Sequence, residues 1–293
     1  MTGKKKILFI INPVSGVGRQ KIVEELLPEK LDHSLFDIAI SYTQYPHHAV
    51  KIAKEASERG TDIVVSVGGD GSANDVAQGL INSNSAMGII PVGSGNGLAH
   101  HLKIPTNITK AIEIINRSKT STIDTGLMNG KLFLSIAGLG FDALVAEKFA
   151  QSKRRGFWPY FKLVFFEYFK FKGHDYIINF DDKSIQRKAL LISFANSNQF
   201  GYNVILAPKA SIDDGYIDLC IVKRMSVINA AMAVPRLFLK NFDTSRHVEV
   251  YKVKEAKIQC SEPVFSHIDG DPHDHLSDVH MKIQPRSLKI IVP

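Results

Sequence analysis

Ile63-Val64-Val65-Ser66-Val67-Gly68-Gly69-Asp70-Gly71-Ser72-Ala73-Asn74-Asp75 joins a strongly apolar run to a glycine-rich turn. The Val- and Ile-rich run is typical of a strand buried on both faces of a sheet. The glycines let the backbone turn sharply and come close to a ligand, because no Cβ atom stands in the way. Apolar residues at helical spacing follow from Val76 to Ile81, and the free N–H groups at the start of such a helix favour anions. We therefore predict a ligand-binding turn at the carboxyl end of a buried strand; a plain strand-to-helix turn is the alternative.

The composition is that of a globular protein and excludes several classes. The chain has 293 residues, with 44% hydrophobic and 22% charged residues. No apolar run reaches the ~18–20 residues of a membrane-spanning helix, and the short run after Lys4-Lys5-Lys6 is read as a first strand rather than a signal peptide. Cys220 and Cys260 lie in apolar segments, as reduced thiols of a cytoplasmic protein do. The net charge of +7 predicts an anionic partner without naming it.

Strands and helices alternate in the first part of the chain. The predicted strands are Ile7–Ile11, Phe36–Ser41, Ile63–Val67 and Gly88–Val92, with helical stretches between them. This order is typical of a parallel sheet covered by helices, a Rossmann-like α/β domain. The carboxyl ends of such strands form a ligand crevice, and three of them carry glycine and small polar residues.

After Thr120 the pattern changes to short strands joined by polar turns, which predicts an antiparallel β-sandwich. Two helical insertions, Asp142–Tyr168 and Ser226–Leu239, interrupt it. We expect an α/β domain over residues 1–125, a β-sandwich domain over 126–285, and a last strand, 286–293, that returns to the first domain. The predicted strands of this part are Ile123–Leu127, Lys131–Ala137, Tyr176–Phe180, Lys188–Ala195, Val204–Ala207, Tyr216–Val222, Val248–Val253, Ala256–Cys260, Val264–Ile268, His280–Ile283 and Leu288–Val292.

Two common nucleotide-binding motifs are missing. The chain has no Walker A sequence, and the loops Gly16–Lys21 and Gly93–Gly97 lack the third glycine of the dinucleotide fingerprint. A nucleotide would have to be held by other loops. Asn12-Pro13-Val14-Ser15-Gly16 can present backbone amides and short side chains to a phosphate, although a simple helix cap would look the same.

Several weak motifs occur together in a fixed order. They are Asn12-Pro13-x-Ser15-Gly16, Thr43 before a helix, Gly68-Gly69-Asp70-Gly71-Ser72-x-Asn74-Asp75, Pro91-x-Gly93-Ser94-Gly95-Asn96, Gly138-x-Gly140-Phe141-Asp142, Asp214-Gly215-x-x-Asp218 and Asp269-Gly270-Asp271-Pro272. With them the chain resembles, from Ile7 to Pro293, the soluble diacylglycerol kinase family, which also holds the sphingosine and ceramide kinases. The resemblance implies ATP-dependent phosphorylation of a lipid hydroxyl, in a cleft between a nucleotide domain like those of NAD kinases and phosphofructokinases and a β-sandwich domain.

The resemblance also implies roles for single residues. Asp70 would organise the active-site Mg²⁺ or act as the base, and Asp271 would deprotonate the lipid hydroxyl with Asp269 nearby. Asp142 would contact the lipid headgroup, or simply cap the helix that starts there. A second, structural Mg²⁺ would be held by Asp214 and the carbonyl groups of Ser211 and Tyr216. The nucleotide would be contacted by Asn12, Ser15, Gly16, Thr43, Gly68, Gly69, Asp70, Gly71, Ser72, Asn74, Gly93, Ser94 and Asn96.

The chain departs from the family pattern at the acceptor side of this site. Asp271 stands where the family more often has Glu, which shortens the reach of the carboxylate by one methylene. Gly97 stands where many bacterial diacylglycerol kinases carry Asp, so this loop looks more like the sphingosine and ceramide kinase branch. The sequence therefore leaves the lipid open.

The segment Gln151–Lys172 alternates aromatic and cationic residues. Rings that enter the headgroup region and cations that meet anionic lipid suit a segment lying on a membrane surface. We expect a peripheral membrane protein with a lipid substrate; a core helix edged by solvated lysines is the alternative. His273, His275 and His280 beside three aspartates resemble a transition-metal cluster, but their spacing matches no zinc pattern.

Other functions fit the sequence less well. A kinase of a soluble substrate, like the NAD kinases or phosphofructokinases, would not need the aromatic segment. A nucleotide- or lipid-binding regulator without catalysis stays open because of Asp271 and Gly97. No nucleic-acid-binding motif is present, and an exposed strand edge could support a homodimer.

Overall fold

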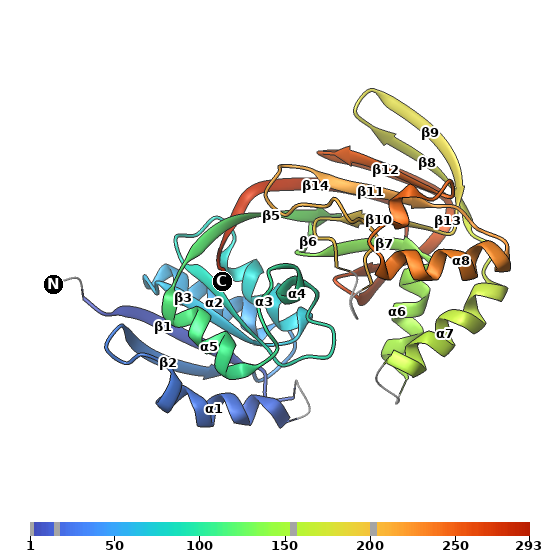
Figure 1. Ribbon diagram of the computed structural model, residues 1–293. Helices are drawn as coiled ribbons and strands as arrows, with labels where there is room; N and C mark the ends of the chain where they lie inside the picture. Colours follow the sequence, from blue (N-terminus) through green and yellow to red (C-terminus); the bar gives the residue numbers. More distant parts are fainter. Residues whose placement is uncertain (1–2, 15–17, 153–156, 200–203) are drawn as a thin grey trace. The chain divides into compact units, whose positions relative to one another are not determined.

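The computed structural model describes residues 3–14, 18–152, 157–199 and 204–293. It divides into two compact units (Figure 1). Unit 1 comprises Met1–Ile123 and Arg286–Pro293, and unit 2 comprises Asp124–Pro285. The chain passes between the units within two strands, β5 (Thr120–Met128) and β14 (Asp271–Ile291).

Unit 1 contains a parallel sheet with the strand order β2-β1-β3-β4-β14. Strands β3 (Ile63–Gly68) and β4 (Ala86–Pro91) are buried along their whole length, as their apolar runs predict. The end of β14 pairs with β4 in parallel through Ile290 and Met87. The remaining strands are β1 (Lys5–Ile11) and β2 (Phe36–Tyr42).

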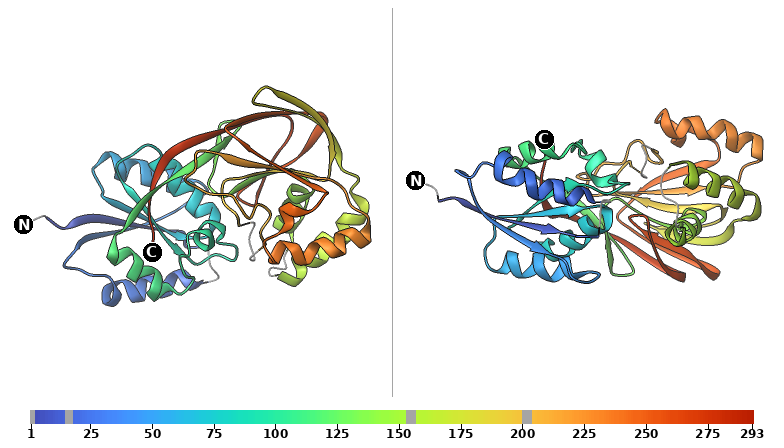
Figure 2. Two further views of the ribbon diagram at one scale, coloured as in Figure 1. Left: turned by 45° about the horizontal axis from the view of Figure 1, so that its top comes forward. Right: turned by 90° about the horizontal axis from the view of Figure 1, so that it is seen from below.

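Helices cover both faces of this sheet (Figure 2). Helix α1 (Arg19–Lys30) packs with α5 (Ile108–Arg117), and α2 (His48–Glu58) packs with α3 (Asp70–Leu80). The chain leaves β1 toward β2 and then returns past β1 to β3, so the winding direction reverses between β1 and β3. Such a switch point is where α/β sheets bind ligands. The short helix α4 (Gly97–His101) follows β4.

Unit 2 is a β-sandwich whose two layers share β13 (Glu255–Ile268). One end of β13 pairs with β7 (Ile136–Gly140). From β7 the layer extends sideways through β10 (Leu191–Ala195), β11 (Ile217–Val222) and β12 (Val248–Val253), each paired with the one before it. The other end pairs with β8 (His174–Phe180), which pairs with β9 (Lys183–Ala189). β13 also pairs along its length with β14, and β5 pairs with β14 and with β6 (Lys131–Phe133).

Two apolar cores lie on the two faces of β10 and β11. Ile192, Phe194 and Leu219 belong to the core inside the sandwich. Leu191 and Cys220 face a second core on the outside, covered by the helices α6 (Phe141–Gln151), α7 (Phe157–Lys170) and α8 (Val227–Phe238). Burying each large apolar side chain stabilises the fold by about 1.5–3 kcal/mol. The short 3₁₀ helix η2 (Phe242–Thr244) follows α8.

The predicted fold class is confirmed, and several predicted elements differ in detail. The helical insertion expected over Asp142–Tyr168 consists of two helices, α6 and α7. Lys131–Ala137 is divided between β6 and β7, because the backbone amides of residues 134–136 turn to the Asp269 carboxylate. Ala256–Cys260 and Val264–Ile268 form one strand, β13, whose register shift between Gln259 and Ser266 imitates a break. His280–Ile283 and Leu288–Val292 likewise fall in the single strand β14. Of the expected strand Val204–Ala207, only an isolated bridge from Ile205 to Gln199 forms among the described residues.

Candidate active site

The carboxyl ends of the unit 1 strands bring several predicted nucleotide contacts to one edge of the sheet. Asn12 follows β1, and its side-chain amide donates to the Ser72 hydroxyl at 3.4 Å. Its backbone N–H donates to the Val67 carbonyl of β3 at 3.3 Å. Thr43 follows β2, and its N–H donates to the Ile11 carbonyl at 3.0 Å. These residues therefore belong to one cluster on unit 1.

The two glycine loops of this edge lie back to back. A Cβ atom on Gly93 would lie only 2.5 Å from the Gly69 Cα atom, so only glycine allows this approach. The Gly93 N–H donates to the Gly68 carbonyl at 3.3 Å. The Asn96 side chain is buried and donates to the Gly93 carbonyl at 2.7 Å, which holds the second loop in place. Asn96 therefore supports the loop from within.

Asp70 opens helix α3 at the centre of this arrangement. A Cβ atom on Gly95 would lie 2.7 Å from the Asp70 Oδ2 atom, so the loop can pass this close to the carboxylate only because residue 95 is glycine. An acidic side chain in the first turn is also stabilised by the positive end of the helix dipole. A half-buried carboxylate at this edge fits an Mg²⁺ ligand, since Mg²⁺ prefers one or two carboxylates together with water and phosphate oxygens.

One predicted nucleotide contact, Asn74, makes a hydrogen bond within its own helix. The sequence analysis also missed the contact between His47 and Asp75. Asn74 is buried in α3, and its amide oxygen accepts from Gln78 at 2.7 Å. The His47 Nδ1 atom lies 2.9 Å from the Asp75 Oδ1 atom and ties the start of α2 to α3. In the sequence, the only sign of this contact is a single histidine directly before a helix. Ser15 and Gly16 lie outside the described residues.

In unit 2, Asp269 holds the turn that carries Asp271. The Asp269 carboxylate accepts backbone N–H groups from Leu134 (2.9 Å), Ser135 (2.8 Å) and Ile136 (3.1 Å). These charge-assisted bonds fix the turn between β13 and β14. Asp271 is the first residue of β14 and is exposed. The turn thus presents the Asp271 carboxylate to solvent, while Asp269 anchors it.

A buried hydrogen bond connects Asp142 to the same turn. The His267 Nε2 atom lies 3.0 Å from the Asp142 Oδ2 atom, and both side chains are buried. The Gly270 N–H donates to His267 Nδ1 at 3.4 Å, so the arrangement fits a ring that accepts at Nδ1 and donates from Nε2. Asp142 also accepts the Ala143 N–H at 2.9 Å. Sequence reasoning missed His267, because a single histidine in an apolar strand resembles an ordinary core residue.

The predicted structural Mg²⁺ site has suitable oxygen ligands, but the Lys252 ammonium already contacts the Asp214 carboxylate. The Asp214 carboxylate accepts the Tyr216 N–H at 3.1 Å and also contacts the Lys252 ammonium. The adjacent Gly215 N–H donates to buried Asp124 at 2.7 Å, which holds the turn. Carboxylate and carbonyl oxygens, with Ser211 nearby in sequence, suit Mg²⁺. An ion at Asp214 would compete with Lys252.

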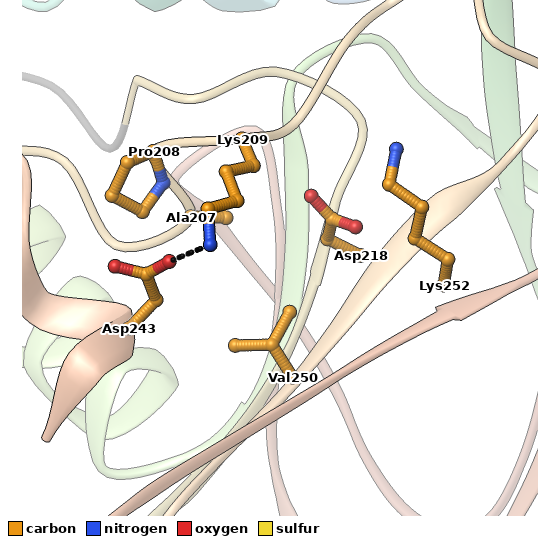
Figure 3. Close-up of a pocket in the computed structure, with 7 residues that line it drawn as sticks. All are labelled: Ala207, Pro208, Lys209, Asp218, Asp243, Val250 and Lys252. Carbon is orange, nitrogen blue, oxygen red and sulfur yellow. Dashed lines mark ion pairs between the residues drawn. The ribbon is translucent and has the colours of Figure 1, made fainter.

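A cavity of about 310 Å³ lies beside this turn (Figure 3). Asp218 lines it between the side chains of Lys209 and Lys252, and its Oδ2 atom is buried and has no hydrogen-bond partner among the described residues. Burial raises the pKa of Asp218 to about 6, although Lys252 opposes the shift. Lys209 is already paired with Asp243 at 3.2 Å. The second aspartate of the Asp214-to-Asp218 motif therefore faces a polar cavity.

The histidine-rich turn does not form a metal cluster in the part of the chain that the structure describes. His275 pairs with Glu147 at 3.1 Å, and His280 pairs with Glu255 at 2.7 Å. His273 lies 3.2 Å from the Lys131 ammonium. These separate partners fix the strands of unit 2.

Comparisons with known proteins match both units. A family model for the diacylglycerol kinase catalytic domain matches residues 6–128, and a model for the YegS C-terminal NAD kinase beta sandwich-like domain matches residues 135–292. The diacylglycerol kinase of Staphylococcus saprophyticus is 27% identical over 92% of this chain and 89% of that protein. A solved diacylglycerol kinase from Bacillus anthracis has a TM-score of 0.75 at 21% identity, and the match covers 100% of this chain and 98% of the other. An NAD kinase from Archaeoglobus fulgidus, solved in complex with ATP, has a TM-score of 0.54 at 12% identity, over 98% and 93% of the two chains.

A parallel sheet with glycine loops at its switch point and a separate β-sandwich define a two-domain fold class that also contains the NAD kinase from Archaeoglobus fulgidus. Within that class, the chain belongs to the diacylglycerol kinase family. The family predicted from the ordered motifs is thereby confirmed. The chain is a kinase by family.

Proposed function

We propose that this protein transfers the γ-phosphoryl group of ATP to the hydroxyl group of a lipid of the diacylglycerol, sphingosine or ceramide type. The observation that supports this most is the Asp70 carboxylate beside Gly95, at the edge where the two glycine loops meet. Glycine loops and helix N-termini bind phosphates, and a carboxylate among them needs a cation. The curated relative from S. saprophyticus carries the name diacylglycerol kinase.

Unit 1 supplies the phosphate end of the reaction. The backbone amides around Gly69 and Gly93, with the Ser72 and Ser94 hydroxyls, bind and orient the triphosphate. Asp70 holds Mg²⁺, which when bound neutralises charge on the phosphate oxygens. Phosphoryl transfer depends mainly on such positioning and charge stabilisation.

Unit 2 supplies the base. Asp271 accepts the proton of the lipid hydroxyl as the oxygen attacks the γ-phosphorus atom, while the bond from that atom to the β–γ bridging oxygen breaks and ADP leaves. Asp269 and the His267–Asp142 pair hold the turn on which Asp271 stands. Because the Asp142 carboxylate is already hydrogen-bonded to His267, Asp142 affects the substrate indirectly, by holding this turn.

The test measures phosphorylation by labelled ATP and Mg²⁺ of diacylglycerol, sphingosine, ceramide and monoacylglycerol in mixed micelles, with NAD and a sugar phosphate as soluble acceptors. We expect one lipid to be labelled. Label on NAD or the sugar phosphate would replace the proposal with a kinase of a soluble substrate. No label on any acceptor would favour a regulator without catalysis.

Matched variants test the two carboxylates. Asp70→Asn and Asp271→Asn should each reduce kcat by about 10²–10⁴-fold, and the double variant should lose little more, because residues that act on one step are not additive. The controls are Asp37→Asn in unit 1 and Asp182→Asn in unit 2, both exposed. Control-like rates for Asp70→Asn and Asp271→Asn would refute the assignment.

A further inference from the structure

Helices α7 and α8 are apolar on both sides. On α7, Tyr160, Leu163, Val164 and Tyr168 pack against the outer core of unit 2. The opposite side exposes aromatic rings, and Trp158 is 69% exposed. A helix on the surface of a globular protein typically carries charged or polar residues on that side. The exposed rings are Trp158, Phe161, Phe165, Phe166 and Phe169.

Helix α8 repeats this arrangement, although the sequence showed no aromatic signal there. Ala230 and Leu237 pack on the outer core, while Ile228 on the opposite side is 74% exposed. The exposed apolar residues of α8 and its end are Val227, Ile228, Met232, Val234, Phe238 and Leu239. Scattered single exposed apolar residues are normal, but a contiguous set marks an interaction surface.

The two exposed sides belong to one region of unit 2. Both helices cover the same outer core, and the Tyr168 hydroxyl donates to the carbonyl of Met225, just before α8, at 2.8 Å. The two views in Figure 2 place α7 and α8 on the same side of the β-sandwich. We call the exposed residues of the two helices the α7/α8 surface.

Within residues 157–172 and 224–242, the exposed charged side chains are positive. Glu167 is the only acidic residue between 157 and 172, and it is buried and paired with Lys148 at 2.7 Å. Residues 226–242 contain no acidic residue. The exposed cations near the two helices are Lys162, Lys170, Lys172, Arg224 and Lys240. This pattern complements an anionic surface with an apolar interior, which is a lipid bilayer rich in anionic lipid.

A bilayer fits these observations better than a second copy of the chain. Two copies related by a twofold axis would bring the same cations toward each other. No helix of the described residues is long and apolar enough to cross a membrane, so the helices would lie in the interface. We infer that the α7/α8 surface docks this protein on anionic lipid bilayers, with α8 contributing as much as α7. The inference rests on the proposed function, because an enzyme that phosphorylates a lipid must reach that lipid in a bilayer.

The chain carries its own reporter for the test. Trp158 is the only tryptophan and lies within the surface. Phosphatidylcholine vesicles with and without phosphatidylglycerol are added to the full chain without ATP. We expect a blue shift of the Trp158 emission and co-sedimentation with the anionic vesicles only, weakening as salt is raised.

Variants on each helix separate the contributions. Phe166→Ser on α7 and Ile228→Ser on α8 should each weaken vesicle binding about tenfold. Lys162→Glu and Lys240→Glu should each weaken binding to anionic vesicles by at least about fivefold, the loss expected for one cation. Ile177→Ser, an exposed apolar residue of β8, is the matched control and should bind like the unchanged chain.

Three outcomes would overturn the inference: equal binding to neutral vesicles, loss of binding in the Ile177→Ser control only, or a dimer dispersed by Phe166→Ser while vesicle binding persists. Because the assay contains no ATP, its result is independent of catalysis. Vesicle binding without lipid phosphorylation would refute the proposed function alone, and phosphorylation in micelles without vesicle binding would refute this inference alone.

Discussion

Gly138 decides whether the pair that supports the candidate base can form. A Cβ atom at this position of β7 would lie 2.4 Å from Asp142 Oδ2 and 2.5 Å from His267 Nε2. Both side chains are buried and engaged with each other, so neither can move aside without breaking the pair. The glycine therefore serves the packing of two side chains rather than a turn of the backbone.

We expect Gly138→Ala to lower the free energy of unfolding by about 1–3 kcal/mol through overpacking. In a His267→Ala background the same substitution should cost clearly less, because the imidazole that it displaces is gone. Denaturant unfolding of the single and double variants measures this coupling. Additive losses would show that the strain lies elsewhere.

Glu249 is the centre of a charged network on β12. Its carboxylate accepts from Arg187 at 3.0 Å, from Lys223 at 2.6 Å and from the Tyr251 hydroxyl at 2.8 Å. Burial alone would raise the pKa of Glu249, but these hydrogen bonds lower it from 4.5 to about 2. Because the pKa in the folded state lies below the unfolded value, the network stabilises the fold above pH 4.5, and this contribution is lost as the pH falls toward 2.

Glu249→Gln should therefore cost about 1 kcal/mol at neutral pH, the scale of a partly exposed ion pair. The difference from the unchanged chain should shrink as the pH falls from 4.5 toward 2. Unfolding midpoints between pH 7 and pH 3 measure it, with exposed Glu113→Gln as the control. A loss that stays constant over this range would contradict the assignment.

At the scale of elements, the close packing of α2 on α3 sets where α3, and hence Asp70, lies. Gly79 faces α2 so closely that a Cβ atom would lie 2.6 Å from the Val50 carbonyl oxygen and 2.7 Å from the Ala53 Cβ atom. The backbone of α2 is at contact, so a larger residue must push the two helices apart.

Gly79→Ala should lower the free energy of unfolding by about 1–3 kcal/mol, even though alanine is the better helix former by ~1 kcal/mol. Under the proposed function it should also reduce kcat, because α3 carries Asp70. Glu58→Ala, at an exposed position of α2, is the control and should change stability by less than about 0.5 kcal/mol. A stabilised Gly79→Ala variant would show that the helices can separate freely.

At the scale of the whole molecule, the end of the chain completes the sheet of the first unit. β14 begins in unit 2 and passes into unit 1 after Pro285, where Arg286 adopts a positive φ of 50°. Leu288 and Ile290 are then fully buried in unit 1. The folding of unit 1 therefore depends on residues that follow the whole of unit 2 in the sequence.

We expect Ile290→Ala to destabilise unit 1 by about 2–5 kcal/mol, the cost of emptying a buried isoleucine site. Far-UV circular dichroism follows the helices of both units, whereas Trp158 fluorescence reports unit 2. The circular dichroism transition should shift to lower denaturant in Ile290→Ala and stay in place in the adjacent exposed control, Lys289→Ala. Equal behaviour of the two variants would mean that the last strand is dispensable.

The sequence alone predicted the fold class, the glycine loops and the family, because these depend on local signals: apolar runs, glycines at strand ends and motifs in a fixed order. The glycine-rich turn also pointed to Asp70, and the resemblance to the family pointed to Asp271; their catalytic roles stay predictions. The sequence alone missed His267, the joining of α8 to the aromatic helix and the role of Gly138. These depend on which side chains meet after the chain folds, and no local pattern encodes contacts between residues far apart in the sequence. Tertiary structure also gave Asp269 its three backbone donors, because the amides of residues 134–136 reach that carboxylate only when β7 pairs with β13.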